Sequence, residues 1–186
     1  MGHALIVIGA SAGGLHALSV ILAQLPTEFS ASLAIVQHRR PDDTSLLRDL
    51  LGRKSRLPVL EPCHGEPIVA GHVYLAPANY HLLIESGSIA LSIDAPVRCS
   101  RPSMDLLFES AAMAYRDKTI GVVLTGANAD GAIGAGALAA VGAPLIVQNP
   151  SSAESPACPQ AALERVPSAL VLHLDEIAPR LIEMCL

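Results

Sequence analysis

Short apolar runs alternate along the chain with longer segments whose apolar residues recur at helical spacing. Residues 4–8 and 32–36 are short, apolar and rich in β-branched residues, which is typical of buried strands. Leucine and isoleucine recur every three or four positions in residues 13–25, and leucines do so again in residues 45–51. The start of the chain therefore predicts a strand, a tight turn and a helix, repeated once.

The middle of the chain follows a different pattern, in which short β-like segments are separated by glycine and proline. These segments are residues 58–60, 73–76, 81–85 and 89–93, with a hairpin turn expected at residues 86–88. We interpret residues 57–93 as a β-rich insert between the strand and helix units.

The second half of the chain returns to the alternation of helices and strands. Helical spacing reappears in residues 104–113, where Ser103 is the expected N-cap. Asp175 is placed to cap the last helix. The other predicted elements are a buried strand at 119–124, a helix at 131–141, a strand at 145–147, a loop at 150–159, an edge strand at 172–174 and a helix at 176–184.

This order of elements predicts the fold class. Alternating strands and helices favour an α/β fold with a doubly wound, mostly parallel sheet, helices on both faces and a short β-hairpin-rich insert. A length of 186 residues fits a single domain, spanning residues 1–186. Because such sheets bind ligands at the carboxyl ends of their strands, the residues that follow predicted strands are the candidates for function.

Composition narrows the class of protein further. With 51% hydrophobic and 16% charged residues, the chain can build a core and is not a disordered protein. A net charge of −5 and an aromatic content of 3% argue against nucleic-acid binding. The apolar runs are much shorter than the roughly 20 residues of a membrane span, and no secretory signal is visible, so we expect a cytoplasmic protein. Four widely spaced cysteines are expected to be reduced thiols: Cys63, Cys99, Cys158 and Cys185.

Ser11 follows the first predicted strand in a setting that suits a nucleophile. Residues 9–13 fit Gly-x-Ser-x-Gly, and small flanking residues permit the sharp strand-to-helix turn that exposes the hydroxyl. Ser11 could instead cap the following helix, with the glycines allowing a tight turn or a phosphate contact. A nucleophilic role requires a general base within reach.

His38 and Asp130 are the candidate partners of this serine. His38 lies just past the second predicted strand, and Asp130 lies in a polar loop after the strand at 119–124. Taken alone, His38 could be a surface histidine and Asp130 part of an Asx turn or a helix cap. Taken together, three strand ends supply a nucleophile, a base and an orienting carboxylate. Their chain order differs from that of the α/β-hydrolases, so a separate arrangement is expected.

Five motifs occur in order along nearly the whole chain: Ile8-Gly9-Ala10-Ser11-Ala12-Gly13-Gly14, Val36-Gln37-His38, Gly71-His72-Val73-Tyr74-Leu75-Ala76-Pro77, Arg101-Pro102-Ser103-Met104-Asp105, and Leu124-Thr125-Gly126 through Asp130-Gly131. With these motifs the chain resembles the methylesterase domain of the CheB family, the chemotaxis receptor-glutamate methylesterases.

The resemblance implies a function as well as a fold. It makes Ser11 the nucleophile, His38 the general acid/base and Asp130 the carboxylate that orients it. The expected reaction is hydrolysis of glutamyl γ-methyl esters on the cytoplasmic domain of a methylated chemoreceptor, with no metal or cofactor. Deamidation of glutamine side chains is expected by the same route, because an amide reacts through the same type of tetrahedral intermediate.

The resemblance also implies a substrate-binding region. The backbone N–H groups of Ala12 and of residues near Ala127 are expected to stabilise the oxyanion. Gly13 and Arg101, which belong to the first and fourth motifs, are expected to line the substrate side of the site. The best-known relatives have Thr in place of Ala12 and Met in place of Ala127, and often Met-Pro-Arg in place of residues 158–160, so substrate choice is open.

Regulation is open for a related reason. The usual family architecture places a phosphorylatable receiver domain and a linker before the esterase domain, whereas here the nucleophile motif begins almost at Met1. The expectation is that the esterase works alone, that a separate regulatory or signalling protein controls it, or that the sequence is part of a longer protein.

Other interpretations compete with this one. The chain could be a non-catalytic receptor-binding scaffold of the same fold, or a serine esterase with another substrate. A nucleotide-binding module is disfavoured because no Gly-x-Gly-x-x-Gly spacing surrounds Ser11. A zinc site could use three histidines that lack the paired helical spacing, His64, His72 and His81. If Asp130 is not the acid, Asp42 or Asp43 is next in line.

Overall fold

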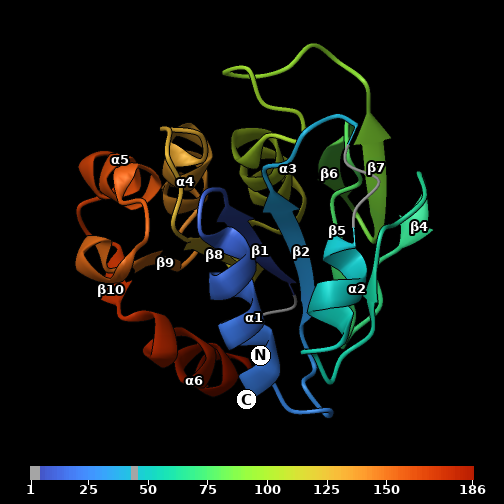
Figure 1. Cartoon of the computed structure of the whole chain (residues 1–186), viewed down its shortest axis with the longest axis horizontal. Coiled ribbons are helices and arrows are strands. Elements are labelled where there is room, and N and C mark those ends of the chain that lie inside the picture. The colour runs from blue at the N-terminus through green and yellow to red at the C-terminus, as the bar shows by residue number, and fades with distance from the viewer. Residues whose placement is uncertain (1–4, 43–45) are drawn as a thin grey trace.

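A computed structural model describes residues 5–42 and 46–186, in which a central parallel sheet carries helices on both faces (Figure 1). The strands of this sheet stand in the order β10-β9-β8-β1-β2-β5-β3, and every neighbouring pair is parallel. Their bounds are β1 Leu5–Ala10, β2 Ser32–Gln37, β3 Val59–Leu60, β5 Val73–Leu75, β8 Thr119–Val123, β9 Leu145–Gln148 and β10 Leu170–Leu172. The predicted doubly wound fold is confirmed.

The helices divide between the two faces because side chains alternate along each strand. On β1, Ile6 and Ile8 pack on one side with α1, α2 and α6, whereas Leu5 and Val7 pack on the other with α3, α4 and α5. The helices are α1 Gly14–Gln24, α2 Leu47–Gly52, α3 Met104–Tyr115, α4 Ala132–Ala140, α5 Ala157–Arg165 and α6 Leu174–Cys185, and the 3-10 turns are η1 Arg116–Lys118 and η2 Pro150–Ser152.

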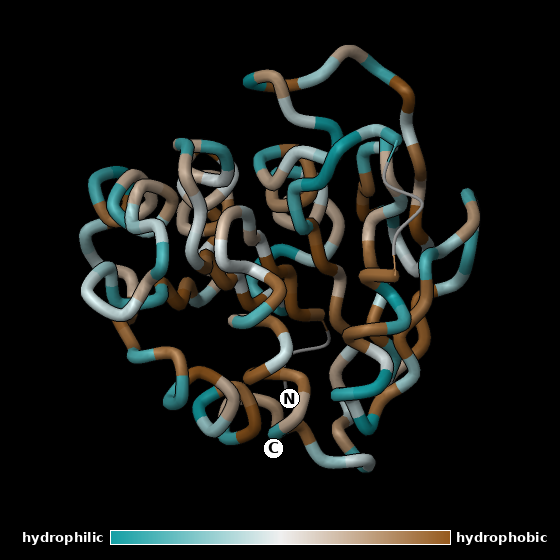
Figure 2. The backbone as a smooth tube through the Cα atoms, viewed as in Figure 1, coloured by the Kyte–Doolittle hydropathy of each residue, from teal (hydrophilic) through white to brown (hydrophobic). Residues whose placement is uncertain are grey.

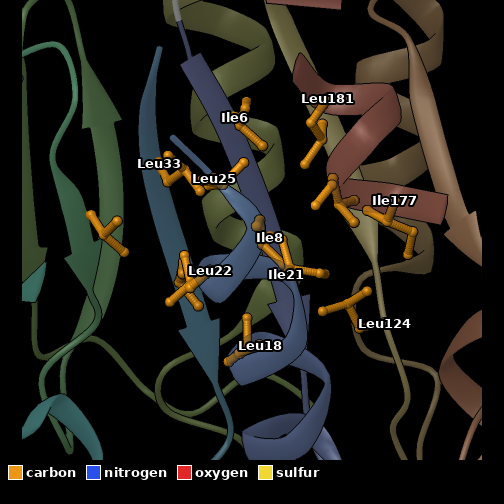
Figure 3. Close-up of a cluster of buried hydrophobic side chains, with 14 of the residues drawn as sticks. Ile6, Ile8, Leu18, Ile21, Leu22, Leu25, Leu33, Leu124, Ile177 and Leu181 are labelled. Carbon is orange, nitrogen blue, oxygen red and sulfur yellow. The ribbon is translucent and has the colours of Figure 1, made fainter. Parts of the chain in front are cut away.

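Both faces of the central strands are buried, which explains their nearly continuous apolar sequences. All six residues of β1 and of β2 are buried. The apolar stretches of the chain gather in these strands, and polar residues dominate the outer loops (Figure 2). Ile8 of β1, Leu22 of α1 and Ile177 of α6 belong to one cluster of the core (Figure 3). No helix within residues 5–42 and 46–186 is both long and apolar enough to cross a lipid bilayer.

The segment predicted as one β-rich insert is divided between two sheets, so that prediction is wrong in part. β3 and β5 extend the main sheet as parallel strands beside β2. Only β4 Glu66–Pro67, β6 His81–Glu85 and β7 Ser88–Ser92 form a separate antiparallel sheet, with β6 and β7 as the predicted hairpin. Strands of two or three residues carry too few positions for periodicity to assign them to a sheet.

Three predictions near the carboxyl end are also corrected. The loop predicted at 150–159 contains η2 and the start of α5, because the first turn of a helix tolerates proline. The edge strand lies at Leu170–Leu172, two residues earlier than predicted, and α6 begins at Leu174. The N-cap of α6 is His173 rather than Asp175, in a capping box with Glu176.

The helix predicted from residue 45 begins at Leu47, and residue 45 lies outside the described residues.

The sheet order places the candidate residues around one point. β1 lies between β2 and β8, so the chain winds in opposite directions on either side of it. Such a reversal leaves a crevice at the carboxyl ends of the strands. Ser11 directly follows β1, His38 directly follows β2, and Asp130 lies in the loop after β8.

Candidate active site

The backbone around Ser11 is held by hydrogen bonds from three directions. The Ser11 N–H donates to the carbonyl of Thr125 over 2.9 Å, and its carbonyl accepts from Gly14 N–H at 2.8 Å and Gln37 Nε2 at 2.9 Å. Gly13 occupies the N-cap position of α1 with a φ of 79°, a left-handed conformation that glycine adopts without strain. No side chain caps α1. The Ser11 hydroxyl is therefore not used as a helix cap.

The imidazole of His38 connects the serine to the aspartate. Its Nδ1 lies 3.2 Å from Ser11 Oγ, and its Nε2 lies 2.7 Å from Asp130 Oδ2. A carboxylate can only accept, so Nε2 carries the proton and Nδ1 presents its lone pair to the serine hydroxyl. The side chain of His38 is 12% exposed and that of Asp130 is fully buried. The structure thus brings all three sequence-predicted residues into one hydrogen-bonded line.

Asp130 is held by the first residues of α3 as well as by His38. Its Oδ1 accepts from Ser103 Oγ at 2.9 Å and from the Asp105 N–H at 3.2 Å. Its Oδ2 accepts from the Met104 N–H at 2.7 Å in addition to His38 Nε2. These backbone amides belong to the free N–H groups that begin every helix, which favour a negative charge. The carboxylate is fixed in both position and direction.

These contacts decide the charge of Asp130. Burial by itself raises the pKa of a carboxyl group, but the hydrogen bonds from His38 and Met104 outweigh it and hold the pKa of Asp130 below its usual range. Asp130 is therefore ionised at neutral pH, which suits a group that orients and stabilises an imidazolium.

Most of this support is not predicted from the sequence. The sequence pattern predicts Ser103 only as the N-cap of the helix that follows. Ser103 does occupy the N-cap position of α3, but its hydroxyl donates to Asp130 instead of capping its own helix. Met104 and Asp105 were assigned no role in the site. The available signal was a serine and an aspartate together at a predicted helix start.

A second carboxylate, Asp105, clamps the loop that carries Asp130. Its Oδ1 accepts from the N–H groups of Gly131 and Gly134, each at 2.9 Å, at the start of α4. Burial raises the pKa of Asp105, and the neighbouring Asp130 carboxylate raises it further against the lowering effect of those two N–H groups. Asp105 and Asp130 thus tie the first turns of α3 and α4 to each other.

The loop after β8 passes very close to the serine. A Cβ on Gly126 would lie 3.0 Å from Ser11 Cβ and would overlap Cys158 Sγ, so only glycine fits there. Asn128 Oδ1 accepts from the Asp130 N–H at 3.1 Å and from Cys158 Sγ at 3.5 Å. Burial raises the pKa of Cys158 to about 11, so its thiol is protonated and donates.

The predicted oxyanion donors lie at the surface of this site. Ala12 and Ala127 are both exposed, on the loops after β1 and β8. Within the described residues, neither N–H donates a hydrogen bond to another group of the chain. Both amides are free to face a substrate oxygen. That they do so remains a prediction.

Arg101 lines a cleft of about 170 Å³ beside His38, together with Asn79, Cys99 and other residues. Its guanidinium donates to Asn79 Oδ1 at 2.6 and 3.0 Å and to the carbonyls of Ile93 and Asp94 at 2.7 and 2.9 Å. Its charge borders the cleft while its N–H groups hold the wall in place. A substrate contact by Arg101 remains a prediction.

The alternative sites are not assembled in the described part of the chain. Asp42 is exposed and pairs with Arg40, whereas Asp43 lies outside the described residues. No group of three or more His, Cys, Asp or Glu within residues 5–42 and 46–186 is arranged to hold a metal ion. The three histidines considered for zinc bond elsewhere: His64 to Leu91, His72 to Ala70, and His81 to Ser103 and Ala95.

A serine, a histidine and a buried aspartate in line at the switch point of a doubly wound sheet define the class as an α/β fold with a Ser-His-Asp hydrolase geometry. Comparison with known proteins identifies the particular family. Residues 6–181 match the family described as CheB methylesterase. The chain belongs to this family.

Individual relatives agree with the family match. A Leptospira interrogans protein with the provisional name protein-glutamate methylesterase/protein-glutamine glutaminase is 42% identical over 99% of this chain and 96% of its own length. Protein-glutamate methylesterase/protein-glutamine glutaminase 2 of Anaeromyxobacter dehalogenans is 40% identical over 96% of this chain. The chain spans only 52% of that relative. The crystal structure of the Thermotoga maritima CheB methylesterase catalytic domain superposes with a TM-score of 0.92 at 33% identity, covering 98% of this chain and 99% of that domain.

Proposed function

We propose that this chain hydrolyses γ-methyl esters of glutamyl side chains on the cytoplasmic domain of a chemoreceptor. The observation that carries the proposal is the hydrogen-bonded line from Ser11 Oγ through His38 to the buried Asp130 carboxylate. Membership of the CheB methylesterase family and the names of its relatives support the substrate class.

In the first half of the reaction, Ser11 Oγ attacks the ester carbonyl carbon while His38 Nδ1 takes the hydroxyl proton. The buried Asp130 stabilises the imidazolium that forms, because its negative charge faces Nε2 at 2.7 Å. The N–H groups of Ala12 and Ala127 donate to the oxyanion of the tetrahedral intermediate. His38 then returns the proton to the leaving oxygen, and methanol departs from a glutamyl ester of Ser11.

The second half restores the enzyme. His38 Nδ1 removes a proton from water, the hydroxide attacks the acyl carbon, and the proton passes to Ser11 Oγ as the glutamate carboxylate leaves. A glutamine side chain reacts in the same way and releases ammonia, which accounts for a glutaminase activity. The steps need only a serine, a base, oxyanion donors and water.

The proposal also covers the compartment, the substrate cleft and the regulation of the enzyme. A chemoreceptor cytoplasmic domain as substrate places the reaction in the cytoplasm, with residues 1–186 acting as one catalytic domain. The cleft of about 170 Å³ beside His38, which Arg101 borders, is the proposed place for the substrate chain next to the ester. Control by a separate regulatory or signalling protein is part of the same proposal.

The test is methanol release from a methylated chemoreceptor cytoplasmic domain, measured with the parent chain and with Ser11→Ala. We expect release by the parent and none above background with the variant. Binding of the receptor domain by both proteins without release by either would contradict the proposal and favour a scaffold. Release from simple esters but not from the receptor would favour a serine esterase with another substrate.

A further inference from the structure

His81 has no role in the proposed reaction, yet it is completely buried and both of its ring nitrogens are hydrogen-bonded. It begins β6, next to the start of α3. Its Nδ1 accepts the backbone N–H of Ser103 at 3.2 Å, and its Nε2 donates to the carbonyl of Ala95 at 3.3 Å. Because a backbone N–H can only donate and a carbonyl can only accept, the ring is neutral with its proton on Nε2.

The two partners of this ring lead to different parts of the candidate site. Ser103 donates its hydroxyl to Asp130 Oδ1 at 2.9 Å, and Asp130 in turn accepts from His38. Ala95 is the neighbour of Pro96, which lines the cleft beside His38. One imidazole therefore ties the cleft wall to the residue that orients Asp130.

We propose that His81 is a positioning residue whose neutral imidazole fixes the Ser103 backbone, and through the Ser103 hydroxyl the direction of the Asp130 carboxylate. This inference rests on the proposed hydrolytic role of Ser11, His38 and Asp130. It assigns His81 no contact with substrate.

The arrangement is sensitive to acid in a defined way. Burial lowers the pKa of His81 below its ordinary value of 6.5, and the positive charge of Arg101 lowers it too. The Ala95 carbonyl, Asp94 and Asp130 act in the opposite direction without reversing the shift. Protonation at Nδ1 would set one N–H donor against the donating N–H of Ser103. Once His81 takes up this proton, the enzyme therefore loses the Ser103 anchor.

Two substitutions separate positioning from titration. His81→Gln keeps a neutral acceptor and donor at the same place, so we expect most of the turnover to remain. His81→Leu leaves the buried Ser103 N–H without an acceptor, and we expect kcat to fall about tenfold or more with KM nearly unchanged. The matched control is His72→Gln, because within the described residues the His72 ring hydrogen-bonds to the Ala70 carbonyl and stacks on Tyr74, and it bonds to no residue of the candidate site.

The pH profile of kcat/KM distinguishes positioning from a purely structural role, because a purely structural role would leave the profile unchanged. The acid limb of log(kcat/KM) should be steeper in the parent chain than in His81→Gln, because only the parent loses the Ser103 anchor when His81 takes up its proton. In His72→Gln the limb should match the parent. Acid limbs that coincide in the parent and His81→Gln would overturn the proposal, even if His81→Leu does not fold.

A spectroscopic measurement keeps the inference independent of the proposed function. Nitrogen NMR of the parent chain should show His81 as the Nε2–H tautomer, with a Ser103 amide shift that follows the titration of that ring. If no ester is hydrolysed, the proposed function fails while this measurement still decides the role of His81. A Ser103 amide chemical shift that does not change when His81 is protonated would refute the inference.

Discussion

The first turns of α3 and α4 each bind a buried carboxylate, but the pKa values of the two carboxylates are shifted in opposite directions. The first N–H groups of α3 donate to Asp130, which lies just before α4, and the N–H groups at the start of α4 donate to Asp105, which lies in α3. Each helix thus presents its N–H groups to a carboxylate supplied by the other. The pKa of Asp130 is lowered by its partners, whereas burial raises the pKa of Asp105.

The number and kind of donors explain the difference. Asp130 accepts four hydrogen bonds, one of them from the imidazole of His38. Asp105 accepts two on Oδ1, while its Oδ2 accepts none within the described residues and lies 3.7 Å from Arg98 Nε. Hydrogen bonds from the first N–H groups of a helix therefore hold an ionised carboxylate against His38 at Asp130, whereas at Asp105 they join two helices. Position next to a histidine, not burial, separates the two roles.

The largest effect should come from neutralising the carboxylate that faces His38. We expect Asp130→Asn to fold and to lose turnover by about 10³–10⁴-fold, because the amide can hold the imidazole in the wrong tautomer. Methanol release measures the loss, and circular dichroism checks the fold. Unimpaired turnover in a folded variant would move the acid role to another residue.

Removing the second carboxylate should damage stability more than chemistry. Asp105→Ala leaves two N–H groups of α4 without their acceptor, so we expect the free energy of unfolding to fall by about 1–3 kcal/mol. Turnover should fall by about tenfold or less at a temperature where the variant is folded. Urea denaturation and methanol release are the paired measurements. A loss of turnover equal to that of Asp130→Asn would show that Asp105 is as important for the reaction as Asp130, and would contradict a mainly structural role of Asp105.

The pH dependence of stability should have opposite signs at the two carboxylates. The pKa of Asp130 lies below its ordinary 3.8 in the folded chain, so its stabilisation is complete above that value and is lost as pH falls through the folded pKa. The pKa of Asp105 is raised, so the folded state takes up that proton first and gains relative stability as pH falls towards 3.8.

Urea midpoints between about pH 3 and 6 resolve these signs. Relative to the parent chain, Asp130→Asn should lose less stability on acidification below the ordinary value of 3.8, and Asp105→Asn should lose more over the range above it. Parallel curves for the parent and both variants would show that neither carboxylate titrates differently in the folded and unfolded states.

The smallest effect is expected at Arg98, the cation nearest to the free oxygen of Asp105. The Arg98 side chain is 48% exposed and its Nε lies 3.7 Å from Asp105 Oδ2. Solvent screens such a pair, so Arg98→Gln should change the free energy of unfolding by about 1 kcal/mol or less. The urea midpoint should depend slightly less on salt in the variant than in the parent, because one screened ion pair has been removed. A larger change would mean that Arg98 compensates the buried charge of Asp105.

Sequence reasoning reached Ser11, His38 and Asp130 because one topological rule brings the carboxyl ends of parallel strands together. It could not reach His81 or the use of the Ser103 hydroxyl. Their contacts join β6 and α3 to the loop after β8, and side-chain periodicity says nothing about how such elements face one another. The imidazole direction, with Nδ1 towards the serine, likewise follows from packing and not from pattern.

The sequence likewise predicted the class of the fold but not its shortest elements or α5. The continuous apolar runs of the central strands and the helical spacing of the leucine-rich helices predicted the doubly wound sheet, because both signals extend over enough residues to be recognised. The strands β3 and β5 are too short for that, and α5 was missed because Pro156 and Pro159 resemble loop signals. Proline at a helix start is compatible with the helix because the first N–H groups have no acceptor within it.

Covalent labelling shows whether Ser11 is a nucleophile activated by His38 and Asp130. The chain is treated with a fluorophosphonate, and the modified peptide is located by mass spectrometry. We predict one adduct, on Ser11, that is absent in Ser11→Ala and forms far more slowly in Asp130→Asn. An adduct on another residue, or equal labelling of the folded Asp130→Asn variant, would contradict the account.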